Sequence, residues 1–146
     1  MSHALPETLP APVRRSLDRW HEMVASGDFE KLAEITHPDA LFRSPVAHSP
    51  YKSAMALCVA INAVSKVFEN FVYTRTFASK DGLDVVLEFA ARVTGRDLKG
   101  ADFIKFNEAG QIVEFEVMVR PLSGLMALAE EMGKRVGAEL TTMKQG

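Results

Sequence analysis

In its second half the chain changes from a helical hydrophobic repeat to a repeat of two residues, and this change constrains the fold most. Four consecutive runs rich in Val, Ile, Phe and Thr follow one another: 71–79, 84–95, 99–107 and 111–120. Short turn sequences separate them: Lys80-Asp81-Gly82, Gly95-Arg96-Asp97 and Glu108-Ala109-Gly110. Because loops this short join neighbouring antiparallel strands, the runs predict an antiparallel meander.

Helical patterns precede and follow the predicted strands. Apolar residues at three- and four-residue steps predict a first helix, which Gly27 closes in a left-handed conformation: Val13, Leu17, Trp20 and Val24. Asp28 is expected to cap a short second helix that carries Phe29, and His37-Pro38-Asp39 is expected to stop it.

A brief strand over 40–44 is expected after this second helix. Ser49-Pro50 then predicts the start of a long helix that runs to about Phe68, with proline at the first helical position. Pro121 ends the last strand, and an amphipathic helix follows it. Helices, a strand, a long helix, four strands and a helix predict the α+β class, with a curved sheet wrapped around helices.

Size and composition predict one domain. The chain has 146 residues, of which 47% are hydrophobic and 25% charged, and a chain of this size can bury a core of its own. Three prolines within residues 1–12 predict a flexible N-terminal arm, and a single domain is expected over 13–146. No segment has the pattern of a signal peptide or a membrane span.

Charge and cysteine content disfavour several classes of partner. The 17 basic residues are scattered among 19 acidic ones, so neither nucleic acid nor an anionic membrane is an expected partner. The single cysteine, Cys58, excludes an intrachain disulfide and fits a reduced cytoplasm. No zinc-ligand spacing is present, so no metal site and no cofactor are expected.

Three motifs add a family resemblance to this outline. Trp20 precedes Gly27-Asp28 by seven residues, a strand ends in Phe42-Arg43-Ser44-Pro45-Val46, and Asp102 begins a run that ends at Gly110. In this order, over roughly 13–140, the chain resembles the nuclear transport factor 2-like (cystatin-like) fold and, within it, the SnoaL-like polyketide cyclases. The resemblance implies a cone whose curved, mainly antiparallel sheet encloses a pocket, and it leaves the activity open because this fold hosts many functions.

Ketosteroid isomerases of the same fold use a tyrosine, a base aspartate and a protonated aspartic acid. By resemblance, Trp20 stands in place of the tyrosine, Ser44 in place of the base, and Asp102 matches the second acid. Serine does not take a proton from carbon without an activating base, so the isomerase mechanism does not transfer directly.

Asp102 is the first candidate catalytic residue. Alternation places it on one strand face with Ile104 and Phe106, and the resemblance makes this face concave. Desolvation there raises the pKa of a carboxyl and keeps it neutral as a hydrogen-bond donor. The alternative is that Asp102 lies at a wet rim and bonds a neighbouring turn.

His48 is the second candidate, because it lies in a loop between a strand and a helix where a general base can reach a cavity. With Asp102 it would form an acid/base couple. The alternatives, that His48 caps the next helix or faces solvent, are equally open.

Trp20 and the concave strand faces are the expected substrate-binding wall. With Trp20, by resemblance and alternation, the wall is expected to comprise Phe42, Ser44, Leu87, Phe89, Phe115, Val117 and Val119. A lone tryptophan on an apolar helical stripe also fits plain core packing.

The opposite sheet face carries mixed charges that can pair across strands, and the resemblance implies that it packs against a second copy. A homodimer through this convex face is therefore expected. The expected function is binding, with cofactor-independent acid/base transformation of a cyclase or isomerase kind, of a small hydrophobic molecule. The alternatives are a non-catalytic ligand-binding dimeric module and a protein-binding scaffold with a solid core.

Overall fold

The protein is described by a computed structural model over residues 5–143, apart from the side chains of residues 139 and 141–143. The elements in chain order are α1 (Ala11–Ser26), the 3₁₀ helix η1 (Leu32–Ile35), β1 (Thr36–Arg43), β2 (Tyr51–Lys52), α2 (Ala54–Val67), β3 (Glu69–Ala78), β4 (Asp84–Val93), β5 (Arg96–Phe106), β6 (Ile112–Arg120) and α3 (Leu122–Met143). The strands form one sheet in the order β2-β1-β6-β5-β4-β3. This arrangement confirms the predicted α+β class.

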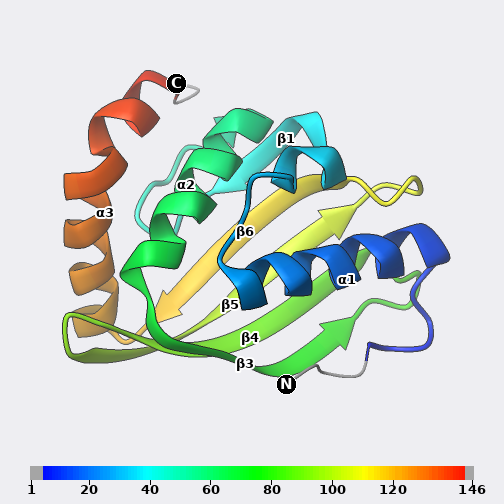
Figure 1. Ribbon diagram of the computed structural model, residues 1–146, viewed down its shortest axis with the longest axis horizontal. Helices are drawn as coiled ribbons and strands as arrows, with labels where there is room; N and C mark the ends of the chain where they lie inside the picture. The colour runs from blue at the N-terminus through cyan, green and yellow to red at the C-terminus, as the bar shows by residue number, and fades with distance from the viewer. Residues whose placement is uncertain (1–4, 144–146) are drawn as a thin grey trace.

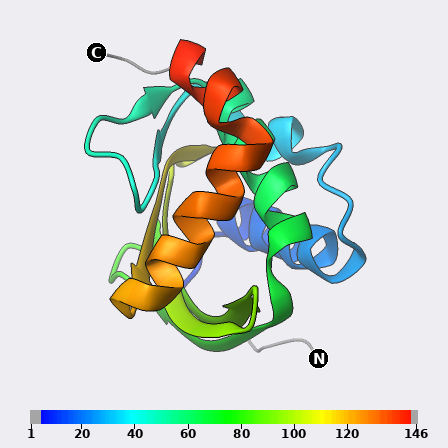
Figure 2. The same cartoon turned by 90° about the vertical axis from the view of Figure 1, so that its left-hand side faces the viewer.

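The sheet is antiparallel except where β1 pairs with β6 in parallel. It curves strongly, and α1 and α2 lie along its concave face while α3 crosses one end (Figures 1 and 2). The predicted meander is confirmed as β3 to β6, and its register places Leu87, Asp102 and Val117 side by side on three strands. Alternate residues of β5 are buried and exposed, with Asp102, Ile104 and Phe106 inside.

The first helix also matches its prediction closely. Gly27 ends α1 with φ +76°, a left-handed conformation that favours glycine, and its N–H bonds the Met23 carbonyl. In the segment expected to be a flexible arm, Leu9 is buried and the Pro6 carbonyl accepts a hydrogen bond from Arg14 at 2.6 Å. Residues 1–4, the rest of that arm, lie outside the described residues.

The element boundaries predicted between Asp28 and Asp39 were wrong. The short helix expected after Asp28 is only the single turn η1, and His37-Pro38-Asp39 belongs to β1 instead of ending a helix. Proline is tolerated in β1 because the pairing with β6 shifts register between Thr36 and Leu41. In this stretch no regular ladder hydrogen bond requires a backbone N–H, which proline lacks.

The helix expected from Ser49-Pro50 begins later. Tyr51–Lys52 pairs with β1 as β2, and Ser53 caps α2 by accepting a hydrogen bond from the Ala56 N–H at 3.1 Å.

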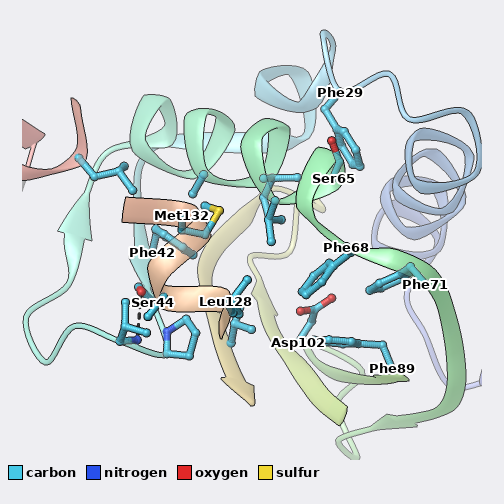
Figure 3. A pocket seen from close by; sticks show the side chains of 18 of the residues that line it. Phe29, Phe42, Ser44, Ser65, Phe68, Phe71, Phe89, Asp102, Leu128 and Met132 are labelled. Atoms are coloured by element: carbon cyan, nitrogen blue, oxygen red, sulfur yellow. Dashed lines mark hydrogen bonds between the residues drawn. The ribbon is translucent and has the colours of Figure 1, made fainter. Parts of the chain in front are cut away.

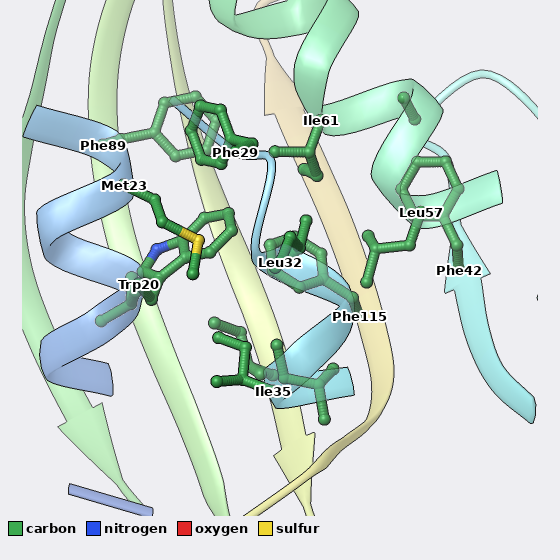
Figure 4. Packing of buried hydrophobic residues seen from close by; sticks show 14 of the residues in the cluster. Trp20, Met23, Phe29, Leu32, Ile35, Phe42, Leu57, Ile61, Phe89 and Phe115 are labelled. Carbon is green, nitrogen blue, oxygen red and sulfur yellow. The ribbon is translucent and has the colours of Figure 1, made fainter. Parts of the chain in front are cut away.

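A solid core fills the space between α1, η1 and the sheet (Figure 4). The Trp20 ring packs on Phe29 and on Phe115, with ring centroids 5.7 and 5.3 Å apart. Phe115 and Leu87 are fully buried. One part of the concave face is therefore closed by close packing, which leaves any cavity to the part under α2 and α3.

Gly100 of β5 supports the wall next to this cavity, and we predict that Gly100→Ala destabilises the fold. An added Cβ would contact the Phe89 ring and lie 2.6 Å from the Met118 carbonyl oxygen. Such overpacking costs about 1–3 kcal/mol of unfolding free energy, measurable by urea denaturation. The exposed neighbour Lys99→Ala is the control and should change stability by less than about 0.5 kcal/mol. Equal stability of Gly100→Ala and wild type would contradict the packing described for Phe89.

Candidate active site and ligand pocket

A cavity of about 360 Å³ lies between the concave sheet face, α2 and α3. Its wall is almost entirely apolar, and Phe42, Phe68, Phe71, Leu128 and Met132 are among the side chains that form it (Figure 3). A volume of this size is within the range of small-molecule sites. The pocket therefore suits a hydrophobic ligand.

Among the described side chains of this wall, Asp102 of β5 is the one carboxyl, and its residue is only 6% exposed. The Tyr73 hydroxyl of β3 donates to Asp102 Oδ2 at 2.7 Å. Trp20 Nε1 of α1 in turn donates to the Tyr73 hydroxyl at 3.0 Å. The three side chains form a chain of hydrogen bonds in which every donor points towards the carboxyl.

Aromatic rings surround the carboxyl. Phe71 contacts the Tyr73 ring edge-on at 4.9 Å between centroids and stacks on Phe89 at 5.0 Å. Phe68 tilts against Phe89 at 5.5 Å. Figure 3 shows Phe68, Phe71 and Phe89 gathered around Asp102. These rings exclude water from the carboxyl and lower the local dielectric.

This environment changes the acidity of both polar groups. Burial raises the pKa of Asp102 to about 7, although the hydrogen bond from Tyr73 acts in the opposite direction. Burial and the adjacent carboxylate raise the pKa of Tyr73 well above its ordinary value. Near neutral pH, Asp102 therefore exists in both its acid and its base form, while Tyr73 keeps its proton and remains a donor.

Several of the residues expected from the sequence lie in the pocket wall. They are Trp20, Phe42, Ser44, Phe89, Asp102 and Val117. The Ser44 Oγ accepts a hydrogen bond from the Val46 N–H at 3.2 Å, which leaves its own O–H available to donate.

Other expected residues lie elsewhere. His48 is exposed in the loop after β1 and is not part of the wall, so the expected couple with Asp102 is not formed. Leu87 and Phe115 are buried in the solid core, and Val119 packs against that core. Alternation identified the correct face of these strands but not which part of the face is covered by α1.

Tyr73 is a pocket residue in contact with Asp102 that the sequence reasoning missed. The strand pattern in FVYTRTFAS does place Phe71 and Tyr73 on one face. Its contact with Asp102, however, joins residues 29 positions apart through two strand pairings, and no local pattern encodes that contact.

Within residues 5–143, no group of three or more His, Cys, Asp or Glu side chains is arranged to hold a metal ion. No helix in that range is long and apolar enough to cross a membrane.

Comparison with solved structures gives close relatives. A steroid delta-isomerase from Pseudomonas aeruginosa is 51% identical over 94% of this chain and 99% of its own, with a TM-score of 0.88. A bacterial protein with a cystatin-like fold from Silicibacter pomeroyi, itself uncharacterised, is 31% identical over 88% of this chain and 91% of its own, with a TM-score of 0.79.

A more distant structure shares the fold alone. The epoxide hydrolase/cyclase-like enzyme SalBIII, described for pyran ring formation in the polyether salinomycin, is 18% identical over 76% of this chain and 92% of its own, with a TM-score of 0.61. None of the curated protein sequences compared with the chain matches it significantly.

The SnoaL-like domain family matches residues 17–115, which include most of α1, the strand β1 that ends just before Ser44, and Asp102. This match covers more than half of the chain. The solved neighbours have the same cystatin-like, nuclear transport factor 2-like architecture. The chain belongs to the SnoaL-like family.

Proposed function

We propose that the protein binds a small hydrophobic carbonyl compound in its apolar pocket and moves a proton on it without a cofactor, in an isomerase- or cyclase-type reaction. The observation that carries this proposal is the buried carboxyl of Asp102 in the wall of a largely apolar cavity, where burial raises its pKa to about 7. The likeness to a steroid delta-isomerase that shares 51% of its residues supports the reaction class.

The ionised form of Asp102 acts as the base. It takes a proton from the carbon next to the ligand's carbonyl, which leaves an enolate and a neutral carboxylic acid. The acid then returns the proton to the same or a conjugated carbon, and the carboxylate is regenerated. Tyr73 donates to Oδ2 throughout, which holds the carboxyl in one orientation. The surrounding rings exclude water that would compete for the proton.

The second candidate function is a non-catalytic ligand-binding module. It is favoured by the position of His48 outside the pocket wall, because this leaves Asp102 without the second acid/base residue expected from the sequence. In this function the neutral form of Asp102 donates a hydrogen bond to a ligand oxygen. The two functions therefore require opposite protonation states of one side chain.

A homodimer through the convex face and a cytoplasmic location complete the proposal. On that face Phe77, Phe103 and Met118 are 52%, 37% and 51% exposed, and Phe77 and Phe103 both pair in register with Val86 of β4. Paired charges surround them, including Arg75 with Glu88. An apolar centre within a charged border is the composition of a protein interface. The single cysteine needs no oxidising compartment.

Deuterium uptake from heavy water tests the catalytic assignment. Tetralone, a two-ring aryl ketone, is incubated with the protein near neutral pH, and deuterium at the carbon beside the carbonyl is followed by NMR. We expect wild type to accelerate the exchange by about a hundredfold or more, and Asp102→Asn to abolish the acceleration because an amide is no base. The acceleration should rise with pH through about 7, where Asp102 ionises.

The matched control is His48→Asn, which removes an exposed ionisable side chain and should leave exchange unchanged. Undiminished exchange by Asp102→Asn would reject Asp102 as the base. Tetralone binding that weakens as pH rises through about 7, with no accelerated exchange, would instead support the non-catalytic module.

The raised pKa also predicts how stability depends on pH. An acid whose pKa is higher in the folded protein stabilises the fold most at low pH, and this contribution is lost as pH rises from about 4 to about 7. Three pKa units correspond to about 4 kcal/mol. Urea denaturation should therefore show that the unfolding free energy of Asp102→Asn, relative to that of wild type, rises by several kcal/mol between about pH 4 and about pH 8. A constant difference between the two proteins would contradict burial of the ionised carboxyl.

Introducing a charge on the convex face tests the dimer. Phe103→Glu places a charge at the centre of the convex face, and we expect analytical ultracentrifugation to show a dimer for wild type and a monomer for this variant. Met126→Glu, at an exposed position of α3, is the control and should sediment as wild type. A monomeric wild type at micromolar concentration would reject the interface.

A further inference from the structure

We propose that a second hollow, at the end of the sheet where β6 runs into α3, binds the phosphate group of a small phosphorylated molecule. The hollow has a volume of about 390 Å³, and its charged wall residues are Arg92, Asp97, Lys99 and Arg120. Figure 1 shows that the turn joining β4 to β5, the end of β6 and the start of α3 lie at this same end of the sheet. Of the residues described for this wall, none also lines the cavity that contains Asp102. The site is therefore separate from that cavity and does not rest on the proposed function.

Strand pairing brings two positive charges together in the hollow. Lys99 of β5 and Arg120 of β6 stand directly opposite each other in the register, and both are exposed, in the charged border of the convex face. Residues opposed in this way have Cβ atoms about 5 Å apart on one face of the sheet, and two like charges there destabilise the pair. Arg92 of β4 adds a third basic side chain to the same wall. An anion bound between Lys99 and Arg120 replaces this repulsion with two attractions.

Nearby carboxylates neutralise only part of this charge. Asp97, the acidic side chain of the wall, pairs with Arg92 at 2.9 Å. Glu88 lies 3.9 Å from the Lys99 ammonium and also accepts a hydrogen bond from another basic side chain, at 2.6 Å. In the part of the chain that the structure describes, no carboxylate forms an ion pair with Arg120. The guanidinium of Arg120 therefore keeps its N–H groups available for a ligand.

The charge of the hollow matches that of a phosphate group. Three basic side chains and one acidic one leave an excess of two positive charges in the wall. A phosphate monoester carries a charge of about −1.5 to −2 at pH 7 and has three acceptor oxygens. A guanidinium donates two parallel hydrogen bonds to such oxygens, and an ammonium adds a mobile point charge. A carboxylate, with a single charge, satisfies fewer of these donors.

The rest of the wall fits the organic part of a phosphorylated molecule. Leu98 and Pro121 give it apolar surface beside the basic side chains. Asn70 of β3 contributes an amide, at a position with φ +55° that asparagine tolerates better than most residues. Because an amide both donates and accepts, it can bond a phosphate oxygen or a hydroxyl of the organic part. These groups favour a phosphate monoester over the free ion.

Titration followed by proton–nitrogen NMR tests the site. Inorganic phosphate, phenyl phosphate and benzoate are the probes, added at constant pH and ionic strength so that general screening does not change. We expect phenyl phosphate to shift the backbone amide signals of residues 91–92, 97–99 and 120. It should bind at least about threefold more tightly than inorganic phosphate, because its ring covers apolar surface. Benzoate should bind at least about tenfold more weakly than phenyl phosphate, because it carries a single charge.

Arg120→Gln and Lys99→Gln each remove one of the opposed charges and should weaken phenyl phosphate binding by at least about fivefold. Both side chains are exposed, so the spectra should otherwise show an unchanged fold. Arg15→Gln makes the same change at an exposed position of α1 and, as the matched control, should alter affinity by less than about twofold. Wild-type affinity in both hollow variants, or signal shifts confined to other parts of the protein, would overturn the site. Equal affinity for inorganic phosphate and phenyl phosphate would overturn the assignment to a monoester.

Discussion

The hydrogen bond between Tyr73 and Asp102 is the interaction on which the proposed chemistry depends. It joins the outer strand β3 to β5 across β4, and it is the described contact that satisfies an oxygen of the buried carboxyl. A buried carboxyl without such a partner would carry a large desolvation penalty. With the partner, burial still dominates and the pKa stays near 7. The fold thereby keeps Asp102 available in both protonation states.

Curvature of the sheet divides its concave face into two regions, the solid core against α1 and the pocket under α2 and α3. Trp20 belongs to both, because its ring packs against Phe115 in the solid core while its N–H donates to Tyr73 at the pocket. A rigid indole fixed on one side by close packing is a firm anchor for the hydroxyl on the other side. Core packing and ligand lining are therefore compatible roles for this tryptophan.

The sequence predicts the strands well, because a repeat of two residues determines which side of a strand is buried. Asp102 could be placed inside for this reason, together with the family resemblance. The same repeat does not tell Phe115 from Val117, which share a face of β6 but lie in the core and in the pocket wall. That distinction depends on where α1 lies. His48 shows a second limit of prediction from sequence, since local sequence does not determine the path of a loop. Pro38 shows that a strand can continue through a local stop signal where its pairing with β6 shifts register.

Titration of the Asp102 carboxyl by carbon NMR tests the central claim most directly. The carboxyl carbon of Asp102, assigned by comparison with the Asp102→Asn protein, should titrate with a pKa of about 7 and not with the values of exposed aspartates. In Tyr73→Phe the pKa should be higher still, because the hydrogen bond that stabilises the charged form is removed. A pKa near 4 in the wild-type protein would contradict the account, since it would mean that the carboxyl is solvated.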